Sequence, residues 1–159
     1  MSNDLVLVID LDGTLKTDYF HDGPFEGESF TIKSSTRTYN FLPRPHVKEF
    51  LEAASKKATL YLGTAAGSSY ARQALKLMDI GHYFDRIIAA EDFGKGNVPF
   101  LKNCIFIDND AEMGSLKMGK MPLTASSAPL RQDLWTIDTF AGDKNDRTML
   151  DLIDELENL

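Results

Sequence analysis

Two aspartates, Asp10 and Asp12, stand one residue apart after an apolar run, and Gly13 and Thr14 follow them. The run, residues 5–9, is typical of a buried strand in a parallel sheet. In open α/β sheets, ligands bind beyond the carboxyl ends of the strands. Two carboxylates this close repel each other unless a cation neutralises them or one of them holds a proton. Both conditions suit phosphoryl transfer, because Mg²⁺ prefers oxygen ligands and a protonated carboxyl can act as an acid.

Further polar side chains follow two other predicted buried strands, residues 58–64 and 105–110. They are Thr64, Asp108, Asn109 and Asp110. Lys95 lies in a glycine-flanked loop that can bring an ammonium to the same edge of the sheet. Carboxylates, a hydroxyl, a cation and an amide are the groups that transfer of a phosphoryl group to a carboxylate requires. The alternative is structural, since strand-end aspartates also cap helices and begin Asx turns.

The elements that must position these residues alternate between strands and helices. The patterns predict a hairpin from residues 29–33 and 37–41, a helix from about residue 46, a strand at 58–64, a helix at 68–78, strands at 86–90 and 105–110, and a helix at 146–158. Residues 114–127 are expected to form a loop. Such βαβ alternation predicts an α/β fold with a mostly parallel sheet covered on both faces.

Composition limits the class of protein. The 159 residues are enough for one domain, spanning residues 1–159, with 43% hydrophobic and 26% charged residues. A net charge of −7 argues against a nucleic-acid footprint. No apolar run is long enough to span a membrane, and the first residues do not resemble a secretory signal. Cys104 is a single cysteine in an apolar run, so we expect a buried thiol and a cytoplasmic location, or a nuclear one in a eukaryote.

Longer segments resemble the haloacid-dehalogenase-type (HAD) phosphatases, and within them the small FCP/SCP-type phosphatases that act on the C-terminal domain of RNA polymerase II. The similar segments are Ile9 to Thr14, Leu42 to Leu51, Thr64-Ala65-Ala66 with Tyr70-Ala71, Phe84-Asp85-Arg86 leading to Glu91, Ile107-Asp108-Asn109, and Phe140, Asp146, Leu150 and Ile153 near the end. The resemblance covers nearly the whole chain and implies a Rossmann-like HAD fold.

The resemblance also implies a role for each matching residue. Asp10 would be the nucleophile that forms an aspartyl-phosphate, and Asp12 would act as general acid and then general base. Thr64 and Lys95 would bind the transferring phosphoryl group. The other expected substrate-binding residues are Gly13, Thr14 and Ala65.

The implied cofactor is Mg²⁺. Its expected ligands are the Asp10 carboxylate, the backbone carbonyl of Asp12, the Asn109 side chain, and Asp108 directly or through water. Asp110 has no counterpart in the resemblance, so a third metal-site acid and a helix N-cap both remain open.

The phosphate-binding lysine is the least secure match, because the stretch between Glu91 and Asp108 is shorter than in the polymerase phosphatases. Lys95 is preferred over Lys102, which directly precedes a predicted strand and can simply cap it.

Between Thr14 and Thr64 there is room for a hairpin insertion, at about residues 18–41, and one helix, but not for a large cap domain. An uncapped site can admit a phosphorylated side chain of a protein, so phosphoserine or phosphothreonine in a protein or peptide is the expected substrate. The alternatives are a small phosphometabolite, a nucleotide or a polynucleotide end, and a non-catalytic FCP/SCP-like binding module.

Overall fold

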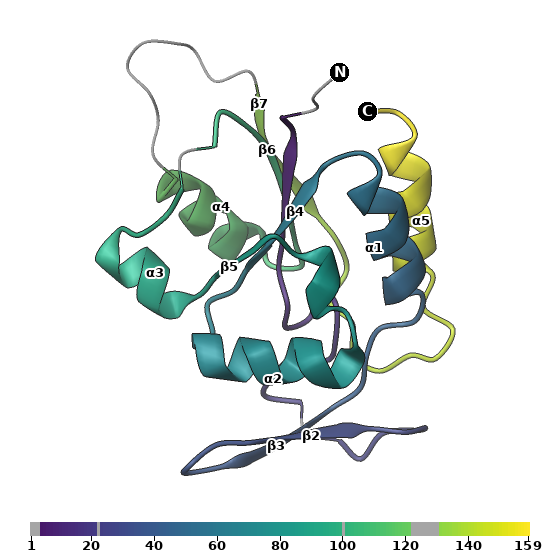
Figure 1. Cartoon of the computed structure of the whole chain (residues 1–159). Coiled ribbons are helices and arrows are strands. Elements are labelled where there is room, and N and C mark those ends of the chain that lie inside the picture. The colour runs from purple at the N-terminus through teal and green to yellow at the C-terminus, as the bar shows by residue number, and fades with distance from the viewer. Residues whose placement is uncertain (1–3, 22, 100, 122–130) are drawn as a thin grey trace.

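A five-stranded parallel sheet forms the centre of the computed structural model, which describes residues 4–21, 23–99, 101–121 and 131–159 (Figure 1). In spatial order the strands are β5 (Arg86–Ile88), β4 (Thr59–Gly63), β1 (Val6–Ile9), β6 (Asn103–Asp108) and β7 (Arg131–Thr136). All four neighbouring pairs are parallel. The parallel α/β architecture predicted from the sequence is therefore confirmed.

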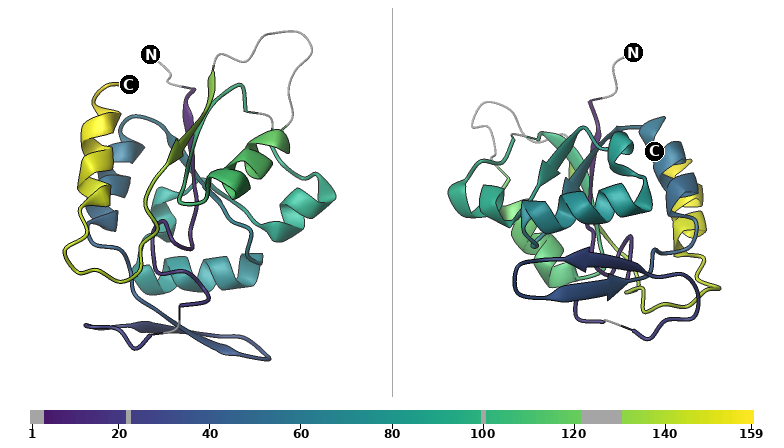
Figure 2. Two further views of the ribbon diagram at one scale, coloured as in Figure 1. Left: turned by 180° about the vertical axis from the view of Figure 1, so that it is seen from behind. Right: turned by 60° about the horizontal axis from the view of Figure 1, so that its bottom comes forward.

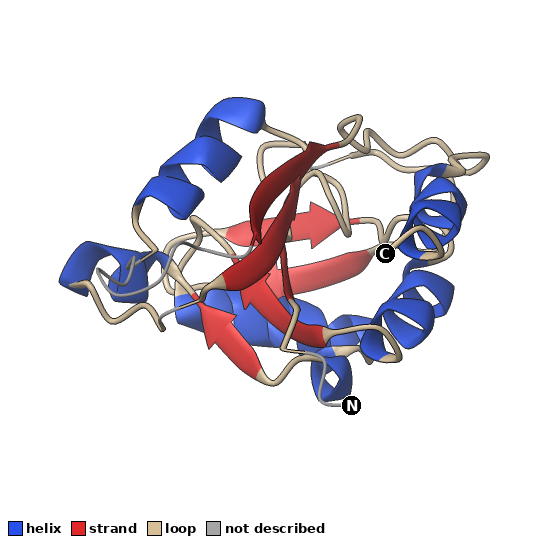
Figure 3. Ribbon diagram, turned by 90° about the horizontal axis from the view of Figure 1, so that it is seen from above, coloured by secondary structure: helices blue, strands red, loops and turns tan. Residues whose placement is uncertain are grey.

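Helices cover both faces of this sheet, as the view from above shows (Figure 3). Side chains alternate along β1, so that Leu7 and Ile9 face one side and Val6 and Val8 face the other. The first side packs against α1 (Val47–Ser55), α2 (Ser68–Met78) and α5 (Thr148–Leu156). The second side packs against residues of α3 (Ala90–Lys95) and α4 (Ala111–Gly119). The turn at residues 81–83 is a short 3-10 helix, η1 (Gly81–Tyr83).

An antiparallel hairpin of β2 (Phe30–Lys33) and β3 (Thr38–Phe41) lies across the end of the sheet where β1 leads into its loop (Figure 2). Ile32 and Phe41 anchor the hairpin because both are buried in the main core. In the described residues between β1 and α1, this hairpin is the only regular structure, so the predicted insertion is present and a large cap domain is not.

Several elements differ from the sequence prediction. Residues 90–95 form helix α3 instead of the end of a strand and a loop, and α4 continues to Gly119 where a loop was expected from residue 114. Strand β7 was not predicted; its alternation of polar and apolar residues is weak, and among the described strands it pairs only with β6. The part of the expected loop at residues 122–127 lies outside the described residues.

None of the helices in the described ranges is long and apolar enough to cross a membrane.

Candidate active site

A cleft of about 840 Å³ opens at the carboxyl ends of β1, β4 and β6. Its floor contains most of the residues predicted from the strand ends. One wall, called here the hairpin wall, consists of Ile32 and Tyr39 of the hairpin and Tyr19 of the loop that precedes it. The predicted residues that line the cleft are Asp10, Asp12, Thr64, Ala65, Asp108, Asn109 and Asp110. The topology of a parallel sheet thus brings together residues that lie up to 100 positions apart in the sequence.

The turn after Asp12 depends on glycine. Gly13 has a φ of +79°, and a Cβ at this position would lie 2.3 Å from the side-chain nitrogen of Asn109. The next residue, Thr14, is fully buried, and its hydroxyl lies 3.2 Å from Asp10 Oδ2 while accepting a hydrogen bond from the Asn109 N–H. Gly13 and Thr14 were predicted to bind substrate, but neither lines the cleft. They instead join the loop after β1 to the loop after β6.

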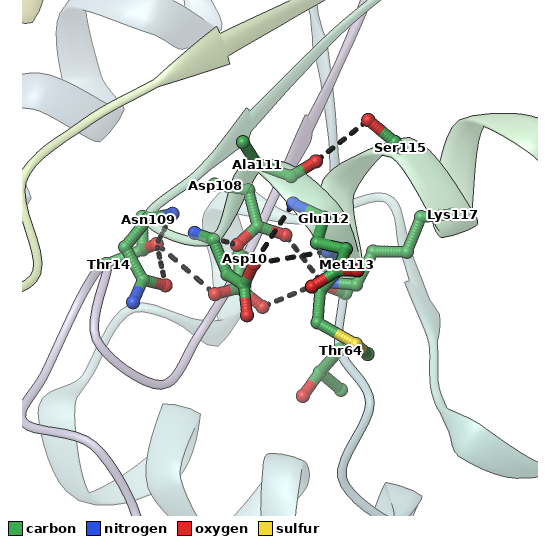
Figure 4. Close-up of polar contacts among 12 residues, drawn as sticks. Asp10, Thr14, Thr64, Asp108, Asn109, Ala111, Glu112, Met113, Ser115 and Lys117 are labelled. Atoms are coloured by element: carbon green, nitrogen blue, oxygen red, sulfur yellow. Dashed lines mark hydrogen bonds and ion pairs between the residues drawn. The ribbon is translucent and has the colours of Figure 1, made fainter.

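The cation of the site is Lys117, which reaches in from α4 (Figure 4). Its ammonium donates to Asp10 Oδ1 at 2.7 Å, to Asp108 Oδ2 at 2.9 Å and to the Gly63 carbonyl oxygen at 2.9 Å. The side chain is only 5% exposed. Burial acts to lower the pKa of Lys117, but the two carboxylates outweigh this effect and raise the pKa above its ordinary value. Lys117 therefore carries a fixed positive charge beside Asp10.

The predicted lysines lie elsewhere. Lys95 is exposed near the end of α3 and does not line the cleft, and the same is true of Lys102 before β6. The lysine that the structure places in the cleft is therefore Lys117, and the prediction that Lys95 lies there is wrong. The signal for Lys117 was Asp110, because a helix capped at this residue carries Met113 and Lys117 on one face, four residues apart.

Asp110 indeed caps α4. Its side chain accepts hydrogen bonds from the backbone N–H groups of Glu112 at 3.0 Å and Met113 at 3.2 Å. Of the two roles left open by the sequence, the structure shows the helix cap.

Asp108 faces the lysine. Its Oδ2 accepts from Lys117, and its Oδ1 accepts from the Asp110 N–H at 2.9 Å. Asp108 therefore holds the Lys117 ammonium and the start of the turn into α4, and the prediction that it binds the metal directly or through water stays a prediction.

Asp10 is buried at the end of β1. Burial raises the pKa of its carboxyl above the ordinary value, while the Lys117 ammonium opposes this rise. Thr64 is also buried, at the end of β4, where its N–H donates to the Ile88 carbonyl at 2.9 Å. Its hydroxyl accepts from the Ala66 N–H at 3.1 Å, which shapes the turn into α2.

The amide end of Asn109 meets two oxygen atoms beside Asp10. One of its two polar atoms lies 2.9 Å from Asp10 Oδ2 and 3.0 Å from the Asp12 carbonyl oxygen. Either the amide turns so that its nitrogen donates to both, or a cation lies between the oxygens. A carboxylate, a carbonyl and an amide oxygen are ligands that suit Mg²⁺. The described residues contain no group of three His, Cys, Asp or Glu side chains arranged around a metal, so the fit rests on this mixed oxygen set.

Two side chains donate hydrogen bonds to Asp12, and the sequence predicted neither contact. Its Oδ1 accepts hydrogen bonds from Lys16 Nζ and, at 2.7 Å, from the Tyr70 hydroxyl. Burial and the charge of Asp12 raise the pKa of Tyr70 well above its usual value, so this hydroxyl remains a donor. Burial lowers the pKa of Lys16, and the adjacent Asp12 carboxylate opposes that effect.

The comparisons with known proteins agree on one family of phosphatases. The model of the NLI interacting factor-like phosphatase family matches residues 5–159. A protein of Dictyostelium discoideum named "Probable C-terminal domain small phosphatase" is 26% identical over 157 residues, which cover 96% of this chain. The chain spans about half the length of that relative, since the match covers 50% of it.

Two solved structures of Fcp1, an RNA polymerase II C-terminal-domain phosphatase, share the fold. One is the fission yeast enzyme bound to beryllium fluoride, with a TM-score of 0.53, and the other gives 0.57. Both are 18% identical to this chain and are matched over 96% of it, and the match covers 49% and 47% of their own lengths. At this identity the likeness establishes the fold alone.

Proposed function

Because the chain belongs to the NLI interacting factor-like phosphatase family, we propose that it hydrolyses phosphate esters of serine or threonine in proteins. The observation that carries the proposal is the placement of Asp10. This buried carboxylate lies at the carboxyl end of the central strand, next to a fixed ammonium, and opens into a cleft of about 840 Å³. A carboxylate in that position is suited to accept a phosphoryl group.

The first step is transfer of the phosphoryl group from the substrate to the protein. A carboxylate oxygen of Asp10 attacks phosphorus, and the bond between phosphorus and the leaving oxygen breaks. Asp12 gives its proton to that oxygen, which leaves as an alcohol. Lys117 lies beside Asp10 and Thr64 lines the same cleft, so their ammonium and hydroxyl can bind the phosphoryl oxygens as charge shifts during transfer.

The second step is hydrolysis of the aspartyl-phosphate. Asp12, now a carboxylate, takes a proton from a water molecule as the water oxygen attacks phosphorus. The bond between phosphorus and Asp10 breaks, inorganic phosphate forms, and Asp12 is again protonated for the next cycle. The same residue therefore serves as acid and as base.

Asp10, the Asp12 carbonyl and Asn109 are the residues that would hold Mg²⁺. Bound there, the ion would supply positive charge to the phosphoryl oxygens and neutralise the carboxylate.

The substrate class is inferred from the shape of the site and from the family. The β2–β3 hairpin is the only regular structure between β1 and α1 in the described chain, so we infer that the opening can accept a side chain that projects from a peptide. The name of the Dictyostelium relative also refers to a phosphatase of a protein domain. Specificity would then depend on the hairpin wall that contains Tyr19 and Tyr39.

The test is hydrolysis of p-nitrophenyl phosphate and of a phosphoserine peptide by the wild-type protein and Asp10→Asn, with Mg²⁺ or with a chelator. We expect turnover that requires Mg²⁺ and is abolished in the variant, with the peptide preferred over a panel of phosphometabolites. Turnover that survives in Asp10→Asn would overturn the mechanism. A folded protein that hydrolyses none of these esters would instead support a binding module.

A further inference from the structure

One oxygen of Asp12 is held from two separate elements. Lys16, in the loop after β1, donates its ammonium to Asp12 Oδ1, and Tyr70, on α2, donates its hydroxyl to the same atom at 2.7 Å. In the described part of the chain, Asp12 Oδ2 makes no hydrogen bond, although Asp12 lines the cleft and its side chain is 18% exposed. The two oxygens of this carboxyl group therefore have different surroundings.

Lys16 is buried behind Asp12 and does not itself line the cleft. Its side chain is fully buried, and its ammonium also donates to the Thr17 carbonyl at 2.8 Å. The ammonium lies 4.9 Å from the centre of the Phe41 ring and 5.2 Å from that of Tyr70. Burying a lysine is costly, and an apolar residue of similar size often stabilises a protein core as well or better. Stability alone therefore does not explain a lysine in this position.

The ring of Tyr70 packs against the hairpin wall. Its ring meets Tyr39 of β3 edge-on, with ring centres 5.6 Å apart, and meets Tyr19 in the same way at 6.1 Å. These edge-on contacts pack the Tyr70 ring, which carries the hydroxyl that binds Asp12. The contact thus orients the carboxyl group through a packed aromatic cluster.

We propose that Lys16 and Tyr70 are positioning residues that fix Asp12 through Oδ1 and leave Oδ2 to exchange the proton with the leaving group and the attacking water. The proposal rests on the proposed phosphatase function. With two donors on one oxygen, the carboxyl plane has a single orientation, and the proton is carried by the other oxygen. Loss of either donor frees the carboxyl group to rotate, so proton delivery slows while binding of the phosphoryl group is unaffected.

The consequence is a dependence on the leaving group. Phenolate is a stronger base than p-nitrophenolate, so phenyl phosphate depends on proton delivery from Asp12 more than p-nitrophenyl phosphate does. The two esters are otherwise similar in size and charge. Their ratio of kcat/KM therefore reports proton delivery and is not changed by a uniform loss of folded protein.

The experiment measures this ratio in the full chain with Mg²⁺ for Tyr70→Phe and Lys16→Met. Correctly placed acids contribute about 10²- to 10⁴-fold, so we expect kcat/KM for phenyl phosphate to fall about tenfold more than that for p-nitrophenyl phosphate. Tyr83→Phe and Lys56→Met are matched controls, since Tyr83 lies on η1 and Lys56 follows α1, both outside the cleft. Their ratios should equal that of the wild type.

Equal losses on both esters in Tyr70→Phe, or no loss, would overturn the proposal. Tyr70→Phe keeps the aromatic ring and removes one oxygen atom, so it decides the question even if Lys16→Met does not fold. If the wild-type protein hydrolyses neither ester, the proposed function itself fails, and the positioning role fails with it. A protein that hydrolyses both esters with an unchanged ratio in the variants would refute the positioning role alone.

Discussion

At the scale of single residues, the site is organised around the ammonium of Lys117. It lies between the carboxylates of Asp10 and Asp108, each within 2.9 Å, in a part of the cleft where all three side chains are at most 10% exposed. Without this charge, two buried carboxylates would face each other, and Asp10 would be disfavoured as an anion. Lys117 therefore helps to keep Asp10 in the state that attacks phosphorus, besides binding the phosphoryl group.

We predict that Lys117→Met lowers kcat/KM for p-nitrophenyl phosphate by about a hundredfold or more, because a preorganised charge is lost from the transferring group. Lys95→Met is the matched control and should retain wild-type activity, since Lys95 is exposed on α3. Steady-state kinetics of the two folded variants, checked by circular dichroism, make the comparison. An active Lys117→Met variant beside an inactive Lys95→Met variant would restore the assignment to Lys95.

The residues that follow strands could be predicted from the sequence, whereas the lysine was indicated only by a helix cap at Asp110 that the sequence left open. Asp10, Thr64, Asp108 and Asn109 end apolar runs, and the topology of a parallel sheet places such ends together. Lys117 instead depends on a helix whose glycines and weak amphipathic pattern resemble a loop. Contacts such as that of Tyr70 with Asp12 depend on side-chain packing, which no local pattern encodes.

At the scale of elements, α4 positions Lys117, and the helix is placed by its contact with the sheet. Gly114 is the point of closest approach: a Cβ there would lie 2.6 Å from Cδ1 of Leu134 on β7 and 3.3 Å from the Cβ of Asp108. The glycine that made residues 114–127 look like a loop is thus the residue that lets the helix pack. Gly119, at the end of the same helix, has no atom within 4 Å of such a Cβ.

We predict opposite effects for two glycine substitutions in this helix. Gly114→Ala should lower the free energy of unfolding by about 1–3 kcal/mol, because the helix must move away from Leu134. The same shift displaces Lys117 and should lower kcat. Gly119→Ala should leave activity unchanged and raise stability by up to about 1 kcal/mol, since alanine favours a helix. Urea denaturation of both variants measures the difference, and equal stabilities would contradict the packing described here.

At the scale of the whole molecule, Arg44 joins the loop after β1 to the C-terminal part of the chain. The guanidinium is buried and makes two hydrogen bonds with the Asp146 carboxylate, at 2.8 and 3.0 Å. It also donates to the carbonyl oxygens of Thr14 at 3.2 Å and Asp138 at 2.9 Å. This residue therefore ties the turn behind Asp10 to the segment that leads into α5.

The ion pair between Arg44 and Asp146 should make the free energy of unfolding depend on pH. Partial burial alone would raise the pKa of the Asp146 carboxyl. Its hydrogen bonds and the charge of Arg44 outweigh this effect and hold the pKa below its ordinary value. A carboxyl whose pKa is lower in the folded state binds protons more readily when unfolded, so its contribution is full above about pH 4 and is lost as the pH falls through the folded value.

We predict that Asp146→Asn lowers the free energy of unfolding by about 3 kcal/mol at neutral pH, because Arg44 remains buried without its charge partner. The difference from the wild type should shrink as the pH falls below about 4. Asp154→Asn, an exposed change on α5, is the control and should alter stability little at any pH. Thermal unfolding between acid and neutral pH checks this, and a difference that stays constant with pH would refute the ion-pair account.

The measurement that tests the central claim most directly is chemical capture of the phosphorylated residue during turnover. The protein is mixed with p-nitrophenyl phosphate and Mg²⁺, quenched in acid and treated with borohydride, which reduces an aspartyl-phosphate to homoserine. Peptide mass spectrometry then locates the reduced residue. The account predicts homoserine at position 10, and none in Asp10→Asn. Active protein with homoserine at another aspartate, or at none, would contradict it.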